Sequence, residues 1–161
     1  MIIWISGLSG SGKTYLADQI TRSFSNRKFI NLDGDHVREC FKINKLDLGY
    51  SLSERKIQVK RLRSIAKILD DQNINVIITA VYVNDSLIKS NRLLFSKYLH
   101  IHFDISIKTL KQLNYKNIYS KNNVIGVDIK KSKISLSNII INKRLKKNQM
   151  LHIFKKINEI I

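Results

Sequence analysis

The chain has 161 residues, of which 43% are hydrophobic, so we expect one globular domain over residues 1–161 and exclude a disordered or fibrous chain. The net charge is +17, but Lys and Asn crowd the whole sequence and proline is absent, so biased composition explains the charge better than nucleic-acid binding, which we treat as an unlikely function. Membrane-length apolar runs and a secretory signal are missing and Cys40 is the single cysteine, so we expect a cytoplasmic protein without a membrane partner or an internal disulfide.

Apolar runs and helical spacing predict strands and helices that alternate along the chain. Residues 75–81 are apolar throughout, as expected of a strand covered on both faces. Residues 53–72 carry apolar side chains at helical spacing, and Ser51 with Glu54 fits a capping box at the start of this helix. In chain order we predict a strand at 2–5, a helix at 13–24, a strand at 28–32, a helix at 53–72, a strand at 75–81, a helix at 86–95, a strand at 98–104, a short helix at 106–113, a strand at 138–142 and a helix at 143–158.

This alternation predicts an α/β fold, a five-stranded parallel sheet with helices on both faces. Ligands of such sheets bind outside the carboxyl ends of the strands. In this chain those ends are Ser6–Gly7, Asp33–Asp35, Ala80–Tyr82 and Asp104. We therefore expect the functional residues to lie in and after these four positions.

The first predicted strand is followed by GLSGSGKT, residues 7–14, which satisfies the P-loop pattern G-x-x-x-x-G-K-[ST] in the strand-to-helix context that the motif requires. Its glycines allow successive N–H groups to point at phosphate oxygens, and the helix N-terminus adds positive potential. Lys13 can reach the terminal phosphates, and the Thr14 hydroxyl can hold Mg²⁺. A flexible Gly/Ser turn is the less favoured alternative. The residues expected to bind a nucleoside triphosphate, which the family resemblance described below implies to be ATP, are Gly7, Ser9, Gly10, Ser11, Gly12, Lys13 and Thr14.

Two carboxylates follow the second predicted strand, Asp33 and Asp35, on either side of Gly34. A carboxylate beside a phosphate-binding loop can orient Mg²⁺ or accept the proton of an attacking hydroxyl. Arg38 lies three residues further on and can hold an anionic substrate through its planar guanidinium. A solvent-exposed Asp-Gly turn explains the spacing nearly as well.

Several linked segments resemble the adenylylsulfate kinase family in order and spacing: GLSGSGKT, LDGDHVR, DLGYSLSER and the apolar strand VIITA. The resemblance runs from residue 2 to about residue 82, and more faintly to about residue 128. It implies the P-loop kinase fold and transfer of the ATP γ-phosphate to the ribose 3′-hydroxyl of a nucleotide that carries a second anionic group. Because adenylylsulfate kinases are commonly dimers, the resemblance also implies a homodimer.

The resemblance assigns roles to particular positions. Asp33 and Asp35 match the family's acidic pair, and Asp35 is the better candidate for the base; with Lys13 they are the expected catalytic residues. Arg38 and Arg55 match arginines that hold the acceptor's anionic groups. The residues expected to bind the acceptor are Asp35, Arg38, Tyr50, Arg55, Gln58, Lys116 and Val124.

The resemblance also covers two further positions of the acceptor site, Tyr50 and Gln58, and a segment that resembles the lid of the family. Tyr50 stands where the family stacks a phenylalanine on the base, and Gln58 stands where the family has an asparagine. A lid-like segment at about 111–135 contains Lys116 and Tyr119, in KNIYSK where the family usually has KGLYKKA.

The departures from the family pattern concern the acceptor. Val124 replaces the family's second stacking phenylalanine, which removes roughly 1–3 kcal/mol of stacking. The family's S-P-Y-R is absent at 84–87, Leu113 replaces a lid arginine, and the stretch after residue 128 has become IKKSKIS. These changes favour a smaller base or an acceptor without sulfate, as in the cytidine diphosphoramidate kinases of bacterial capsule synthesis. Adenylylsulfate is the alternative acceptor.

Two further patterns suggest other functions and are set aside. Asn44, Lys45 and Asp47 match the guanine-reading N-K-x-D of switch NTPases, but they lie too early in the chain and we interpret the match as an accident. His100, His102 and Asp104 alternate along a strand like metal ligands, but we interpret them as a half-exposed polar face opposite buried Leu99, Ile101 and Phe103.

Overall fold

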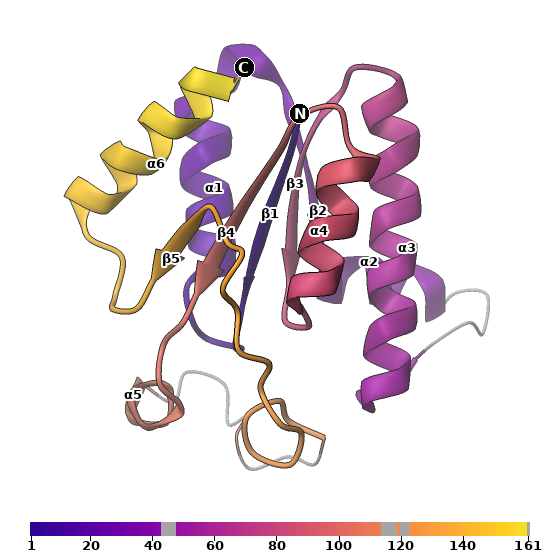
Figure 1. Ribbon diagram of the computed structural model, residues 1–161, viewed down its shortest axis with the longest axis vertical. Helices are drawn as coiled ribbons and strands as arrows, with labels where there is room; N and C mark the ends of the chain where they lie inside the picture. The colour runs from indigo at the N-terminus through magenta and orange to yellow at the C-terminus, as the bar shows by residue number, and fades with distance from the viewer. Residues whose placement is uncertain (43–47, 114–118, 120–122, 161) are drawn as a thin grey trace.

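The computed structural model describes residues 1–42, 48–113, 119 and 123–160, and five parallel strands form its one named sheet (Figure 1). The strand order is β2-β3-β1-β4-β5, so the P-loop after β1 lies at the centre of the sheet's carboxyl edge. The predicted α/β fold with a parallel five-stranded sheet is confirmed. The strands are β1 (Ile2–Gly7), β2 (Phe29–Asp33), β3 (Asn75–Ala80), β4 (Tyr98–Phe103) and β5 (Ile139–Ile141).

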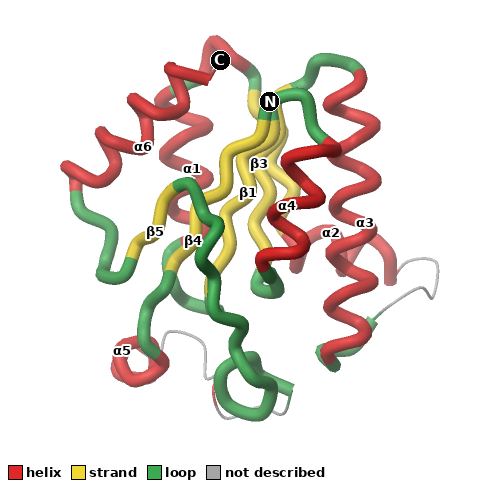
Figure 2. Tube along the Cα trace, in the orientation of Figure 1, coloured by secondary structure: helices red, strands yellow, loops and turns green. Residues whose placement is uncertain are grey.

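Helices cover both faces of the sheet (Figure 2). One face packs against α1 (Lys13–Ser23) and α6 (Lys147–Ile160), whose buried Leu16, Ile20 and Ile153 contact the odd-numbered residues of β1. The other face packs against α2 (Gly34–Lys42), α3 (Leu52–Asp71) and α4 (Asp85–Leu94), around the even-numbered residues of β1. The remaining helices are α5 (Ile107–Leu113) and a short 3₁₀ turn, Ser25–Arg27.

Two helix starts show how local chemistry sets the boundaries. Ser51 and Glu54 form the predicted capping box of α3, with the Ser51 amide and hydroxyl both bonded to the Glu54 carboxylate. The prediction that the last helix begins at residue 143 is wrong, because α6 begins at Lys147. The run KRLKK would place several cations at the positive end of the helix dipole, which is unfavourable.

The predicted half-exposed polar face on β4 is also wrong. Leu99, Ile101 and Phe103 are buried as expected, but His100 and His102 are buried too, with 0% and 3% exposure. Each ring bonds to the Ser6 hydroxyl, and His100 also bonds to Ser137 in the segment that leads into β5. In the part of the chain that the structure describes, no group of three His, Cys, Asp or Glu side chains could hold a metal ion.

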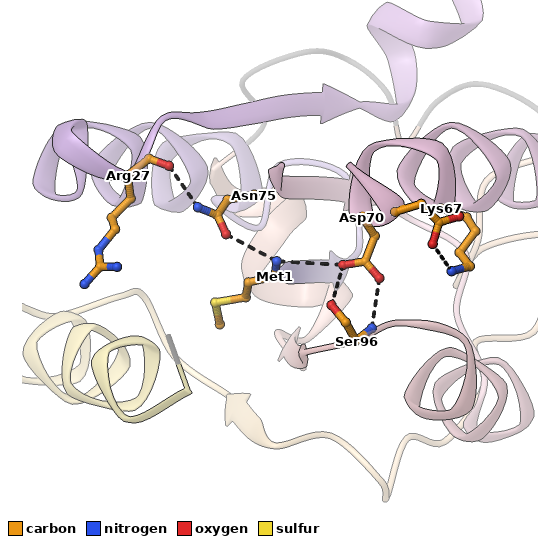
Figure 3. A network of polar contacts seen from close by, with 7 residues as sticks. Met1, Arg27, Lys67, Asp70, Asn75 and Ser96 are labelled. Atoms are coloured by element: carbon orange, nitrogen blue, oxygen red, sulfur yellow. Dashed lines mark hydrogen bonds and ion pairs between the residues drawn. The ribbon is translucent and has the colours of Figure 1, made fainter. Parts of the chain in front are cut away.

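Polar contacts tie the elements together at the amino edge of the sheet (Figure 3). Asp70, near the end of α3, accepts hydrogen bonds from the Ser96 amide and hydroxyl, both at 2.8 Å, and lies 3.8 Å from the Met1 amino group. Asn75 accepts a hydrogen bond from that amino group at 3.2 Å and donates one to the Arg27 carbonyl at 2.8 Å. This network lies opposite the carboxyl edge, where the predicted site residues are.

None of the described helices is both long and apolar enough to cross a bilayer.

Candidate active site

The P-loop after β1 presents unpaired polar groups at the start of α1. Gly12 takes up a left-handed conformation with φ of 100° as the N-cap of α1, and no described side chain caps the first turn. The Ser11 hydroxyl oxygen is buried and has no hydrogen-bond partner among the described residues. Exposed amides at a helix N-terminus bind anions, and a buried unpaired hydroxyl signals a missing ligand. The loop therefore has the geometry of a phosphate site.

Lys13 and the lid residue Tyr119 both contact the backbone of this loop. The Lys13 ammonium donates a hydrogen bond to the Leu8 carbonyl at 2.9 Å. The Tyr119 hydroxyl donates one to the Ser9 carbonyl at 2.6 Å. Burial raises the pKa of Tyr119 to about 12, so its hydroxyl stays protonated and acts as the donor at neutral pH. Tyr119, which belongs to the predicted lid segment, thus contacts the phosphate loop directly.

The two carboxylates after β2 have different environments. One Asp33 oxygen accepts hydrogen bonds from the amides of Asp35 and His36, at 3.0 and 3.2 Å, and the other accepts one from the Thr79 hydroxyl at 2.5 Å. Asp33 therefore holds the start of α2 against the end of β3. The Asp35 side chain is exposed and lines a cavity between α2, α3 and the end of β3.

This Asp35 cavity contains two buried polar atoms without partners among the residues described. Arg38 is 4% exposed; its Nη1 donates to the Leu48 and Gly49 carbonyls, both at 2.7 Å, while its Nε is unpaired. Gln58 is also 4% exposed; its Nε2 donates to the Gly34 carbonyl at 2.9 Å, while its Oε1 is unpaired. Leaving such atoms unpaired costs about 1–3 kcal/mol each, so the cavity suits a ligand with both an acceptor and a donor.

Arg55 connects the cavity to the loop that carries Tyr50. Its Nε donates to the Tyr50 carbonyl and its Nη2 to the Asn123 carbonyl, both at 2.9 Å. The guanidinium carbons of Arg38 and Arg55 lie 4.6 and 5.3 Å from the centre of the Tyr50 ring. The Tyr50 side chain is nevertheless 47% exposed. Burial, followed by the charge of Arg38, lowers the pKa of Arg55.

Val124 lies in a tight turn next to Arg55, since Arg55 donates a hydrogen bond to the carbonyl of the preceding residue, Asn123. Its carbonyl accepts hydrogen bonds from the amides of residues 127–129 at 3.0–3.2 Å, and its own amide donates to the Asp128 carboxylate at 3.1 Å. Val124 is only 7% exposed, so its side chain packs into the protein more than it offers a surface to a ligand. Lys116, the other predicted acceptor residue in this region, and Asn44–Asp47 lie outside the described residues.

Sequence reasoning missed a second cavity that borders the P-loop. Gly10, Ser11 and Gly12 line it together with Ile105, Thr109, Leu110 and Arg144. The apolar residues and Arg144 suit the base of a nucleotide whose phosphates lie on the loop. Arg144 was overlooked because the positive charge of the chain was attributed to its biased composition, and only the fold brings the chain after β5 next to the loop.

The oxygen donors of the site fit Mg²⁺. This ion prefers oxygen ligands and usually binds through one or two protein oxygens, water and substrate phosphates rather than through a complete protein cage. Thr14 is exposed in the first turn of α1, next to the loop amides.

Cys40, the single cysteine of the chain, is exposed on α2. Its sulfur lies 3.8 Å from the Nε2 of His36, one helical turn earlier.

Comparison with known proteins shows the family of this chain. A model of the adenylylsulphate kinase family matches residues 1–131. The cytidine diphosphoramidate kinase of Campylobacter jejuni is 31% identical over 159 residues, covering 91% of this chain and 88% of that protein. The adenylyl-sulfate kinase of Shewanella halifaxensis is 31% identical over 127 residues, covering 75% of this chain and 60% of that protein.

The fold agrees as well. The structure of the Mycobacterium tuberculosis APS kinase CysC in complex with AMPPNP and APS superposes with a TM-score of 0.84 at 19% identity, covering 98% of this chain and 96% of that one. Residues 1–131 make up most of the chain, and they include the P-loop, the Asp35 cavity and Val124. This chain belongs to the adenylylsulfate kinase family and is a phosphotransferase that acts on a hydroxyl group.

Proposed function

We propose that this protein transfers the γ-phosphate of ATP to the ribose 3′-hydroxyl of a nucleotide that carries a second anionic group. The observation that carries the proposal is the Asp35 cavity, where the unpaired Arg38 Nε and Gln58 Oε1 adjoin an exposed carboxylate. An arginine N–H suits an anionic oxygen of the acceptor, and an amide oxygen suits a hydroxyl or amino group.

The residues divide the chemistry between them. Amides of residues 7–14 and Lys13 bind the triphosphate, and Arg144 with Leu110 borders the base. Asp35 accepts the proton of the 3′-hydroxyl as its oxygen bonds to the γ-phosphorus and the bond to ADP breaks. Thr14 would hold Mg²⁺, which neutralises phosphate charge when it is bound. Asp33 keeps Asp35 in place through the backbone of α2.

Cytidine diphosphoramidate is the acceptor we favour. The relative from Campylobacter jejuni that carries this name matches along 91% of the chain, whereas the adenylyl-sulfate kinase of Shewanella halifaxensis matches along 75%. Val124 in place of a stacking phenylalanine suits a smaller base. With this acceptor, the protein would act in capsule phosphoramidate biosynthesis, and we propose that it does so in the cytoplasm. The alternative is adenylylsulfate, with 3′-phosphoadenylylsulfate as the product.

The test is to incubate the purified protein with ATP, Mg²⁺ and each acceptor separately. We expect faster turnover of cytidine diphosphoramidate, with a product that is one phosphoryl group heavier by mass spectrometry. Faster turnover of adenylylsulfate would contradict the cytidine assignment and leave the transfer to a 3′-hydroxyl in place. Chelation of Mg²⁺ should stop either reaction, and light scattering of the same sample will test the homodimer.

A further inference from the structure

A third cavity lies at the carboxyl edge, between the P-loop, the start of α3 and the chain around residue 130. We call it the His102 cavity. It adjoins the Asp35 cavity, because Val81 and Tyr82 line both. The residues that give it its chemistry are Gly7, Leu8, Lys56, His102, Lys130 and Lys131.

His102 brings an unpaired polar atom to this cavity. Its side chain is 3% exposed, its Nδ1 is bonded to the Ser6 hydroxyl at 2.8 Å, and its Nε2 has no partner within the described part of the chain. Burial is the main cause that lowers the pKa of His102 to about 4, so the ring is neutral at neutral pH. A neutral ring bonded to a hydroxyl can donate a hydrogen bond from its other nitrogen to a ligand.

The orientation of that proton can be relayed through buried side chains. The Ser137 hydroxyl bonds to His100 Nδ1 at 2.7 Å, and the Ser6 hydroxyl bonds to His100 Nε2 at 2.9 Å and to His102 Nδ1. When every group of this chain donates in the direction of the cavity, Ser137 donates to His100 and His100 donates to Ser6. Ser6 then donates to His102 Nδ1, and His102 carries its proton on Nε2. An anion in the cavity stabilises this direction, because it accepts the hydrogen bond.

Three ammonium groups add positive charge to the same cavity. Lys131 pairs with the exposed Asp104, while Lys56 and Lys130 are exposed and form no ion pair with the residues that the structure describes. The described lining contains no Asp or Glu. Unopposed cations beside a buried N–H donor favour an anionic ligand.

We propose that the His102 cavity is the subsite for the second anionic group of the acceptor, a phosphate-type group with ionised oxygens held by His102 Nε2, Lys56 and Lys130. The inference rests on the proposed function, since it assumes that the acceptor nucleotide occupies the adjoining Asp35 cavity. It makes Lys56, His102 and Lys130 determinants of acceptor specificity.

The test compares nucleotides with and without this group when the ATP site is filled by a non-hydrolysable ATP analogue with Mg²⁺. CDP is compared with CMP, and adenylylsulfate with AMP, by calorimetry. The preference is the ratio of the two affinities within the nucleotide pair that wild type binds, CDP over CMP or adenylylsulfate over AMP. In the Lys56→Ala/Lys130→Ala variant this ratio should fall about tenfold or more, while the affinity for CMP or AMP should stay within about twofold of wild type. Both lysines are exposed, so the variant should fold.

A matched control is Lys60→Ala/Lys133→Ala, which removes the same charge from the same two segments outside the cavity. It should keep the wild-type preference. His102→Gln, which can still offer an amide N–H, should lose less of the preference than His102→Leu. An unchanged preference in the Lys56/Lys130 variant, or no preference of wild type in either pair, would overturn the subsite. Binding of the adenine pair instead of the cytidine pair would contradict only the choice of cytidine.

Discussion

Asp33 and Asp35 are two residues apart, yet their carboxylates hold different positions. Asp33 is engaged by two amides and the Thr79 hydroxyl, whereas Asp35 is exposed at its cavity. From the sequence alone, a solvent-exposed Asp-Gly turn remained an alternative. Spacing cannot predict which of the two carboxylates accepts hydrogen bonds from the amides at the start of the helix. At the residue scale, the two aspartates should therefore differ in what their loss does.

Asp35→Asn should lower kcat by about 10²–10⁴-fold and leave ATP affinity within about twofold, because it removes the base and keeps the size of the side chain. Steady-state kinetics and calorimetry with the ATP analogue measure the two quantities. Asp33→Asn is the contrast: it should lower the free energy of unfolding, because the amide replaces an acceptor of three hydrogen bonds. Unchanged turnover in Asp35→Asn would remove Asp35 from the role of base.

At the scale of elements, β4 shows what a strand pattern can and cannot predict. Its apolar residues Leu99, Ile101 and Phe103 were predicted to be buried from their alternation alone, and they are. The opposite face was predicted to be half exposed because histidines are polar. His100 is bonded to Ser137, which lies 37 residues further along the chain. The periodicity of the strand alone could not predict that this distant segment covers the histidines.

The buried histidines predict a loss of stability in mild acid. A histidine in the unfolded chain has a pKa near 6.5. Burial lowers the pKa of His100 to about 3 and that of His102 to about 4. Below about pH 6.5 the unfolded state therefore binds more protons than the folded state, and stability falls toward pH 4. Between pH 7.5 and 5 we expect a loss on the order of 4 kcal/mol for the pair, about 2 kcal/mol from each histidine.

Urea unfolding between pH 7.5 and 5 measures this loss, in a range where most carboxylates stay ionised. His102→Gln should flatten the dependence on pH by about one proton. His152→Gln is the control, because His152 is exposed on α6, and its profile should match that of wild type. A wild-type stability that stays constant down to pH 5 would contradict the pKa values.

The same contrast between local and distant causes applies to the active site. The P-loop was predicted correctly as a turn between a strand and a helix, because its geometry depends on eight consecutive residues. The Asp35 cavity needed the family resemblance, since Gln58 and Arg38 come from different helices. Arg144 was missed and His102 was wrongly predicted to be half exposed, because only the sheet order brings β4 and the chain after β5 to the P-loop.

At the scale of the whole molecule, the carboxyl edge of the sheet holds the candidate ligand sites, and the amino edge holds a polar network that stabilises the fold. Of the eight buried side-chain atoms that lack a hydrogen-bond partner in the described part of the chain, four lie at the carboxyl edge, in Ser11, Arg38, Gln58 and His102. At the amino edge, Asp70 accepts both hydrogen-bond donors of Ser96 and lies near the Met1 amino group (Figure 3). Satisfied polar networks stabilise a fold, while unsatisfied atoms mark ligand sites. Substitutions at the amino edge should therefore change stability without changing catalysis.

Asp70→Ala tests this division. It leaves the Ser96 amide and hydroxyl without their acceptor in a buried place, which should cost about 2–4 kcal/mol of unfolding free energy, measured by urea denaturation. Its neighbour Asp71 is the matched control, because Asp71 is exposed and its ion pair among the described residues is the surface pair with Lys67, so Asp71→Ala should change stability by less than about 1 kcal/mol. Below the unfolding transition, kcat and both KM values of Asp70→Ala should stay within about twofold of wild type. A fall in kcat at a temperature where the variant is fully folded would mean instead that the amino edge positions the loops of the opposite edge, and the two duties would not be separable.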